Sequence, residues 1–180
     1  YPQYTVAECL EKDEIYRNRI TCGGDVLDYF GDVTTHTASM ETIKLHWNSV
    51  LSTPGAKYCT GDISNMYLMS LLPEAEFVRF RYDLIPPRII TYYNLDDIVV
   101  DGFVYARINR AWYGLKQGGK IAHDDLVAHL NKHGYVQADN TDGFFKHITR
   151  DISFTLVVDN FGIKYVNNDD VQHIIKIMQE

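Results

Sequence analysis

Two aspartates, each at the end of a predicted strand, carry the chemistry that this sequence indicates. Asp62 closes a strand predicted over residues 57–63, and Asp159 follows the apolar run Leu156-Val157-Val158. Two carboxylates held close together repel each other, so either the pKa of one rises or a cation neutralises both. Hard divalent cations with oxygen ligands meet that need, and a pair of them supports in-line phosphoryl transfer. If the two strands are neighbours, the aspartates predict a metal-dependent phosphotransfer site.

The stretch 152–166 is the element that positions Asp159. Two β-rich runs, 152–158 and 162–166, flank Asp159-Asn160-Phe161, which is the pattern of a tight hairpin. The first run alternates and then turns wholly apolar, which predicts a strand that enters a buried sheet and carries Asp159 at its tip. The alternative is that Asp159 and Asn160 serve only the turn, because both residue types tolerate left-handed backbone.

The rest of the chain predicts an α+β fold, because helices and strands mix without strict βα alternation. Residues 1–15 are weakly patterned, residues 16–29 predict a hairpin broken by Gly23-Gly24, and Asp101-Gly102 is a type I′ turn signal. The helix predicted over 39–51 carries its apolar residues on one face, namely Met40, Ile43, Trp47, Val50 and Leu51. Further strands are predicted over 77–82, 98–100, 103–108, 135–136 and 144–148, and further helices over 65–71, 86–93, from 119 to 133, and 171–178.

Composition bounds the class of protein. With 180 residues, 46% of them hydrophobic, the chain is long enough for one sizeable core and a small second lobe. It has no apolar run of about 18 residues and no signal-peptide pattern, so we expect a soluble, intracellular protein. Because it begins at Tyr1 without Met, we expect a fragment or a processed piece. Cys9, Cys22 and Cys59 are expected to be reduced, and the histidines that share a helix are not expected to bind metal: His123, His129 and His133.

The net charge of −7 argues against a protein that binds nucleic acid over its whole surface. Charge is local, however, and three basic clusters stand out. Their alternative role is to solvate the exposed face of a strand. The clusters are Arg17 with Arg19, Arg79 with Arg81, and the set Arg107, Arg110, Lys116 and Lys120, which no acidic residue interrupts between 103 and 121.

Three short blocks together resemble the signature blocks of reverse transcriptases, most closely those of copia-type LTR retrotransposons. They are Asp62-Ile63-Ser64-Asn65-Met66-Tyr67-Leu68, Tyr113-Gly114-Leu115-Lys116-Gln117 and Val157-Val158-Asp159-Asn160, in that order. Upstream, Arg17-Asn18-Arg19-Ile20-Thr21 with Gly24 and Asp28-Tyr29 is similar to the fingers segment of that family. The resemblance spans most of residues 16–180, and Tyr-Gly-Leu-Lys-Gln is its most specific block.

The resemblance implies a polymerase palm, a central antiparallel sheet backed by helices, with part of a fingers subdomain and no thumb. It implies a fingers-like segment over 1–56, the first palm block over 57–72, a fingers-like insertion over 73–112, and over 113–180 the palm with its Gly/Gln block and catalytic hairpin. The implied reaction is RNA-directed DNA synthesis, in which a primer 3′-OH attacks the α-phosphate of a dNTP on an RNA or DNA template. A nucleotidyl cyclase is a more remote alternative, disfavoured by the Tyr-Gly-Leu-Lys-Gln block.

The same resemblance assigns a role to each matching position. Asp62 and Asp159 would hold two Mg²⁺ or Mn²⁺ ions with the backbone carbonyl of Ile63, and Asn160 stands at the position of the second hairpin acid. Tyr67 would exclude a ribose 2′-OH, the alternative being a core tyrosine. The remaining nucleotide contacts would come from Gln117 and Gly118, from Lys116 at a phosphate, and from Arg19, with Arg17, at the triphosphate; surface roles are the alternative for these lysine and arginine residues.

Two departures from the family pattern favour a second hypothesis. Asn160 lacks the charge of an aspartate, and a unit charge about 4 Å from another is worth about 4 kcal/mol at an effective dielectric near 20. The sequence to Glu180 also contains no thumb and no RNase H domain. The second hypothesis is a relic or domesticated retrotransposon fragment that binds nucleic acid or a protein. The expected partners are a template-primer, dNTPs and the rest of a polyprotein, and no association with a membrane is expected. The expected compartment is the cytoplasm, in a particle, or the nucleus.

Overall fold

The computed structural model describes residues 1–8 and 15–179 of the chain, and Cys9 and the side chain of Arg17 lie outside what it describes. The fold is α+β, as predicted, and every pair of neighbouring strands in the described part is antiparallel. The chain forms two compact units, 1–33 with 67–121 (unit 1) and 34–66 with 122–180 (unit 2). The division into palm and fingers-like segments stays a prediction.

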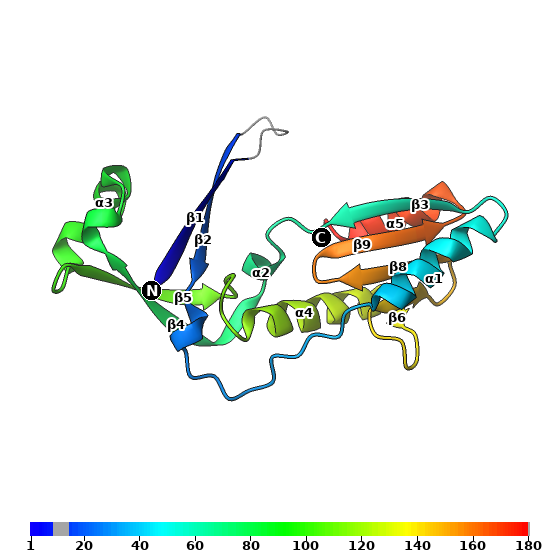
Figure 1. Cartoon of the computed structure of the whole chain (residues 1–180), viewed down its shortest axis with the longest axis horizontal. Coiled ribbons are helices and arrows are strands. Elements are labelled where there is room, and N and C mark those ends of the chain that lie inside the picture. The colour runs from blue at the N-terminus through cyan, green and yellow to red at the C-terminus, as the bar shows by residue number, and fades with distance from the viewer. Residues whose placement is uncertain (9–14, 180) are drawn as a thin grey trace. The chain divides into compact units, whose positions relative to one another are not determined.

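Unit 1 contains two separate two-stranded sheets (Figure 1). The first pairs β1 (Pro2–Glu8) with β2 (Tyr16–Cys22), and the second pairs β4 (Leu71–Arg81) with β5 (Phe103–Arg110). The helix α3 (Pro87–Tyr93) lies between β4 and β5 in sequence, as its Pro-Pro start predicted. Short 3₁₀ turns occupy Gly24–Val26, Tyr82–Leu84 and Leu95–Ile98.

The core of unit 1 joins the end of β2 to the block that begins at Trp112. Cys22, Val78, Ile108 and Leu115 are buried together, with Trp112 packed against them. The Trp112 indole N–H donates to the Ile20 carbonyl oxygen at 2.9 Å, and the Cys22 backbone N–H donates to the Tyr113 carbonyl oxygen at 2.7 Å. These hydrogen bonds hold two segments together that are about ninety residues apart in sequence.

Gly114 allows this close approach of two backbones. Its φ is +97°, in the region that side chains rarely adopt, and a Cβ at this position would overlap the Cys22 carbonyl group. A Cβ on Gly24 would likewise overlap the Gly114 carbonyl oxygen. The two glycines therefore let the chain segments pack backbone against backbone.

Unit 2 is built on a five-stranded sheet in the order β3-β9-β8-β7-β6. The predicted strand over residues 57–63 is β3 (Lys57–Asp62), and the predicted hairpin is β8 (Ile152–Val157) with β9 (Asn160–Tyr165). The short strands are β6 (Tyr135–Gln137) and β7 (Phe144–His147). The helices are α1 (Met40–Leu51), α5 (Asn168–Ile177) and α4 (Gly118–Lys132), which belongs to unit 2 from Ala122 onward.

The two faces of this sheet meet different helices. Successive residues of a strand point to opposite faces. On β8, Ser153 bonds to His46 of α1, whereas Phe154 packs on Tyr135, which in turn contacts His173 of α5. Figure 1 accordingly shows α1 in front of the sheet and α5 behind it. The core lies on the α5 face, and its side chains are less than 2% exposed: Leu130, Tyr135, Phe145, Phe154, Leu156 and Ile174.

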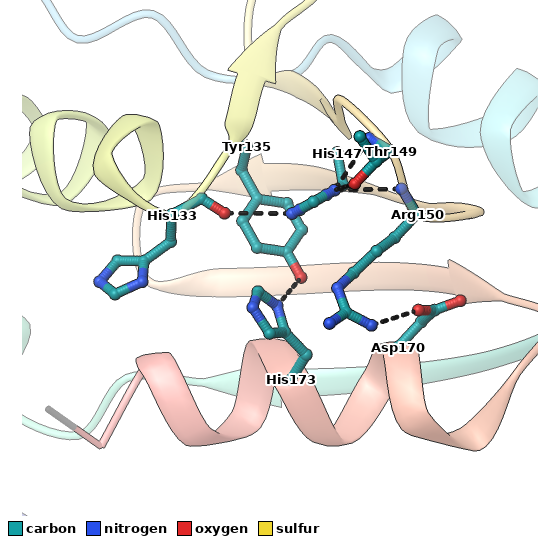
Figure 2. Close-up of polar contacts among 7 residues, drawn as sticks. All are labelled: His133, Tyr135, His147, Thr149, Arg150, Asp170 and His173. Atoms are coloured by element: carbon teal, nitrogen blue, oxygen red, sulfur yellow. Dashed lines mark hydrogen bonds and ion pairs between the residues drawn. The ribbon is translucent and has the colours of Figure 1, made fainter.

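A polar cluster ties the β7–β8 connection and α5 to this core (Figure 2). The His147 Nε2–H donates to the His133 carbonyl oxygen, and its Nδ1 accepts from the backbone N–H groups of Thr149 and Arg150, each at 3.1 Å. This pattern fixes a neutral imidazole with the proton on Nε2. The Arg150 guanidinium pairs with Asp170 of α5 at 2.9 Å.

The hydroxyl of Tyr135 completes the cluster. The Tyr135 side chain is fully buried, and its O–H lies 3.0 Å from Nδ1 of His173. Burial raises the pKa of Tyr135 to about 12, with Arg150 opposing and Asp170 adding to this shift. Burial also lowers the pKa of His147 and of His173.

Several predicted elements differ from the structure. Residues 26–29 form no strand, because β2 pairs with β1, whose polar sequence gave no strand signal. Residues 98–100 contribute only a single bridge, Val100 to Phe103, although the type I′ turn is confirmed by φ values of +50° at Asp101 and +77° at Gly102. The helix predicted over 65–71 is only α2 (Met66–Met69), because pairing with β5 begins at Leu71, and a register shift accommodates Pro73.

The helix predicted over 39–51 is present, with Ser39 as its N-cap, but its predicted apolar face only partly faces the sheet, where Ile43 and Val50 are half-buried. Met40, Trp47 and Leu51 are 59%, 62% and 85% exposed, whereas His46 is buried. Polar partners on β8 and β9 take the sheet-facing side of α1, which periodicity alone did not indicate. No helix in the described residues is long and apolar enough to cross a membrane.

We expect Gly114→Ala to destabilise unit 1 by about 2 kcal/mol or more, because a Cβ there meets the Cys22 backbone and the left-handed conformation costs about 1–2 kcal/mol. The matched control is Gly61→Ala, since a Cβ at Gly61 has no neighbour within 4 Å. Urea denaturation of the full chain measures both. Equal stabilities of the two variants would contradict a close-packed glycine at 114.

We expect acid to destabilise unit 2 through His46. Burial, and then the charge of Lys164, lowers the pKa of His46 to about 4. The unfolded chain, with an ordinary histidine pKa near 6.5, takes up the proton first, so stability is lost as the pH falls from about 6.5 to 4, by up to about 3 kcal/mol. His46→Asn should reduce that loss in urea denaturation across this pH range. Ser153→Ala, which removes only the hydrogen-bond partner, should retain it; equal losses in the two variants would exclude His46 as a cause.

Candidate active site

The structure brings Asp62 and Asp159 to the same end of one sheet. β3 and β9 pair antiparallel, with Asp62 opposite Asn160, and Asp159 directly precedes Asn160. The Ile63 N–H donates to the Asp159 carbonyl oxygen at 3.0 Å, which extends the pairing by one step beyond β3. Within the described residues, β3 lies at the edge of the sheet and not in its centre, so the Asp62 strand pairs only with β9.

The hairpin turn differs in position from the one predicted. Val157 and Asn160 are paired, so Val158 and Asp159 form a two-residue turn and Asn160 begins β9. Val158 has a φ of +58°, which is a rare conformation for a β-branched residue. Strain of this kind persists only where the surrounding structure imposes it. Here the paired strands on both sides impose it, and Asp159 is the residue that the strained turn presents.

Asn160 makes a direct contact with the neighbouring carboxylate. Its Nδ2–H donates to Oδ1 of Asp159 at 2.8 Å. An aspartate at position 160 has no donor to offer and repels Asp159 instead. The substitution of amide for acid therefore gives Asp159 a hydrogen-bond partner within the chain.

The oxygen atoms at this end of the sheet fit a hard divalent cation in kind, though the charge is low. They are the carboxylates of Asp62 and Asp159, the Asn160 amide oxygen and the Ile63 carbonyl oxygen, which are the ligand types that Mg²⁺ prefers. Asp62 is exposed and Asp159 half-buried, so both remain open to solvent ions. Among residues 1–8 and 15–179, no group of three or more His, Cys, Asp or Glu side chains is arranged to hold a metal ion. Within the described residues, Asp62 and Asp159 are thus the acidic side chains that this site offers to a cation.

The residues expected to contact a nucleotide lie in unit 1. The rings of Tyr67 and Tyr113 stack with centroids 4.5 Å apart and an interplanar angle of 14°. Arg19 is exposed on β2, opposite Thr5 of β1. The Lys116 Nζ donates to the Leu27 carbonyl oxygen at 2.7 Å.

Gln117 and Gly118 are both buried at the start of α4. Gln117 is 4% exposed, and its Nε2–H donates to Oε1 of Glu76 at 2.8 Å. Its own Oε1 is one of the buried atoms without a hydrogen-bond partner in the described structure. A Cβ on Gly118 would lie 3.2 Å from the Trp112 carbonyl oxygen. Glu76 was absent from the sequence predictions, since nothing in its neighbourhood marks it as the partner of a residue 41 positions away.

No protein-family model matches the chain, and no solved structure matches it.

We expect Asn160→Asp to strengthen the binding of divalent cations at the hairpin. Without metal, loss of the Asn160 amide contact and repulsion from Asp159 should leave the melting temperature unchanged or slightly lower. With millimolar Mg²⁺ or Mn²⁺, the variant should be stabilised more than the parent, because a cation stabilises the fold that binds it better. A tenfold gain in affinity corresponds to about 1.4 kcal/mol.

Thermal melts with and without metal measure this difference. Asn131→Asp on α4 is the matched control, because it makes the same charge change outside the hairpin. Equal metal-dependent shifts in the parent, Asn160→Asp and Asn131→Asp would show that position 160 serves the turn and does not bind metal.

Proposed function

We propose that this chain is the palm and part of the fingers of a reverse transcriptase of the copia type. The observation that carries the proposal is the pairing of β3 with β9, which sets Asp62 opposite Asn160 and beside Asp159 at the tip of a tight hairpin. Two carboxylates on adjacent strand ends, one of them on a hairpin turn, are what templated nucleotidyl transfer requires of a palm. The proposed reaction is addition of a dNTP to a primer 3′-OH.

In this proposal Asp62 and Asp159 hold Mg²⁺ or Mn²⁺, two ions in all, with the Ile63 carbonyl oxygen as a further ligand. The ions, when bound, stabilise the negative charge that develops on the transferred phosphoryl group. The Asn160 amide holds one oxygen of the Asp159 carboxylate, and pairing with β9 positions the backbone of Asp62. Asn160 contributes an amide oxygen in place of a charge, which reduces the affinity for the ions.

The proposal gives unit 1 the contacts with the incoming nucleotide. Tyr67 discriminates against the ribose 2′-OH, and its stacking on Tyr113 holds the ring in one orientation. Arg19 and Lys116 supply positive charge for phosphates, while Gln117 and Gly118 form the start of a helix, where backbone N–H groups favour anions. The buried hydrogen bond of Gln117 to Glu76 gives that side chain a structural role as well.

A second candidate function is a non-catalytic module, a relic or domesticated fragment that binds nucleic acid or protein. Two contacts favour it. The Asn160 amide already occupies an oxygen of Asp159, and Gln117 is turned into the protein toward Glu76. Both contacts engage, within the chain, side chains to which the reverse transcriptase proposal gives roles at the ligands.

Primer extension by the full chain, with Mn²⁺ and an RNA or DNA template, tests the first function against the second. We expect extension by Asn160→Asp to exceed that of the parent, and Asp62→Asn in the same background to reduce it by about 100-fold or more, as loss of a group that stabilises the transition state does. Asp139→Asn, an exposed residue of unit 2 outside the hairpin, is the control and should retain activity. Template-primer binding without extension in any variant would support the second function and overturn the first.

The same assay with ribonucleotides examines Tyr67. Tyr67→Ala should raise the use of rNTPs relative to dNTPs, whereas Tyr67→Phe, which keeps the ring and its stacking, should preserve the selectivity of the parent. If Tyr67→Ala changes the use of both substrates by the same factor, the residue packs against Tyr113 and does not select the sugar.

A further inference from the structure

Unit 2 contains a cavity of about 550 Å³ between α1 and the strands β7, β8 and β9 (the α1 cavity). All of its lining residues belong to unit 2, including the β7–β8 connection. Its volume lies within the range of small-molecule sites in proteins. The cavity is remote from the hairpin tip. Ser153, which lines it, lies four positions along β8 from Val157, a distance of about 13 Å.

Two lysines flank a serine across the floor of the α1 cavity. Lys146 of β7, Ser153 of β8 and Lys164 of β9 are directly opposite one another in the sheet register, so all three side chains lie on one face. The backbones of β7 and β9 are about 10 Å apart, since strand spacing is about 4.8 Å. The register thus places two lysines and a hydroxyl on the α1 side of the sheet. The Lys164 ammonium reaches Ser49 and Thr53, and the Lys146 ammonium lies 5.3 Å from the centroid of the Phe144 ring.

The charge of Lys164 is not neutralised in the described part of the chain. Its half-buried ammonium donates to three neutral oxygens of α1 and the residues that follow it: the Ser49 carbonyl and hydroxyl oxygens at 3.2 and 3.1 Å and the Thr53 hydroxyl oxygen at 2.8 Å. The ion pairs among residues 1–8 and 15–179 do not include Lys164. A partly buried cation without a counterion is costly, and a bound anion removes that cost.

His46 provides a second, independent indication of a ligand. It lines the α1 cavity, is only 5% exposed, and bonds through Nε2 to the Ser153 hydroxyl oxygen at 3.0 Å. Its Nδ1 is buried without a hydrogen-bond partner in the described structure. Buried polar atoms are nearly always satisfied, so such an atom beside a cavity indicates a polar group that the chain itself does not supply.

The wall of the α1 cavity formed by the β7–β8 connection is held in place by the cluster in Figure 2. Nδ1 of His147 accepts hydrogen bonds from the backbone N–H groups of Thr149 and Arg150, and the Arg150 guanidinium forms an ion pair with Asp170. The Arg150 charge is therefore already balanced by α5. Asp151 is the acidic residue among those that line the cavity, so Lys146 and Lys164 leave an excess of positive charge there.

We propose that the α1 cavity binds a small organic phosphate monoester. A dianionic phosphate matches Lys146 and Lys164 in charge. The Ser153 hydroxyl can donate to a phosphate oxygen when the His46 Nε2–H donates to Ser153, whereas the Ser49 hydroxyl already donates to the His46 carbonyl oxygen. A bare phosphate fills only a small part of 550 Å³. The side chains of Leu45 and Phe144 provide apolar surface for the organic group of the ester.

Isothermal titration of the full chain with phenyl phosphate, inorganic phosphate and phenol tests the proposal. Phenyl phosphate should bind most tightly, and either Lys146→Gln or Lys164→Gln should weaken it by about tenfold or more, the range expected for a charged hydrogen bond. Lys132→Gln, an exposed lysine of α4 that does not line the cavity, should leave the affinity unchanged. Equal affinities in the three lysine variants, or no heat of binding at millimolar phenyl phosphate, would overturn the proposal.

Two further variants distinguish recognition of the phosphate from recognition of the organic group, and a loss of binding from a loss of folding. Leu45→Ala, at a side chain that is 70% exposed, should weaken phenyl phosphate several-fold and leave inorganic phosphate unaffected. Inorganic phosphate that binds as tightly as phenyl phosphate would exclude the monoester. Because Lys164 also bonds to α1, Lys164→Arg keeps the charge and should retain binding; loss of binding in Lys164→Arg with a native circular dichroism spectrum would contradict recognition by charge.

Discussion

The placement of β9 between β3 and β8 is the constraint on which the arrangement of unit 2 depends. β9 forms hydrogen bonds along both of its edges, so Asn160 is opposite Asp62 on one side and Val157 on the other. Phe161 and Ile163 of β9 are buried on one face, while Lys164 reaches α1 on the other. One strand therefore joins the candidate metal site, the aromatic core and the α1 cavity in a single register. A change in that register displaces all three together.

In unit 1 the corresponding constraint is the approach of two backbones at Cys22 and Gly114. The Tyr113–Gln117 block, the most specific of the sequence signals, is in the structure the segment that packs on the end of β2. Lys116 and Gln117 both bond within the unit, to the Leu27 carbonyl oxygen and to Glu76. A motif with a proposed role in nucleotide binding is thus also a packing element of the fold.

Much of the fold followed from the sequence because it is encoded locally. Asp101-Gly102 required left-handed backbone, the apolar spacing over 39–51 predicted α1, and the run from Ile152 predicted β8. The predictions that were wrong depended on distant partners. No local pattern marks Pro2–Glu8 as the strand that pairs with β2, and the apolar periodicity of α1 did not indicate that His46 and Ser49 make its polar contacts with the sheet.

The residues of the candidate site were also predictable from the sequence only in part. Asp62 and Asp159 were identified because strand ends and turns have local sequence patterns. The strand register then showed the two residues on neighbouring strands. The exact position of the turn was not readable, because a β-branched Val158 at φ +58° contradicts the usual turn preferences. His46 and Lys164 gave no signal, since their significance lies in a missing hydrogen-bond partner and a missing counterion, which only the folded chain reveals.

The pairing of β9 on both of its edges also limits how this protein can change in length. A third residue at the turn of Val158 and Asp159 gives a three-residue hairpin loop, while β3 and β8 still hold β9 in register. Side chains of a strand alternate with a period of two, so a residue inserted within β9, between Asn160 and Ile163, exchanges the faces of the residues that follow it. Lys164 would then face the aromatic side chains around Phe154, and Ile163 would face the hydroxyls of α1. The turn therefore tolerates a change in length, whereas an insertion within the strand exchanges core for surface.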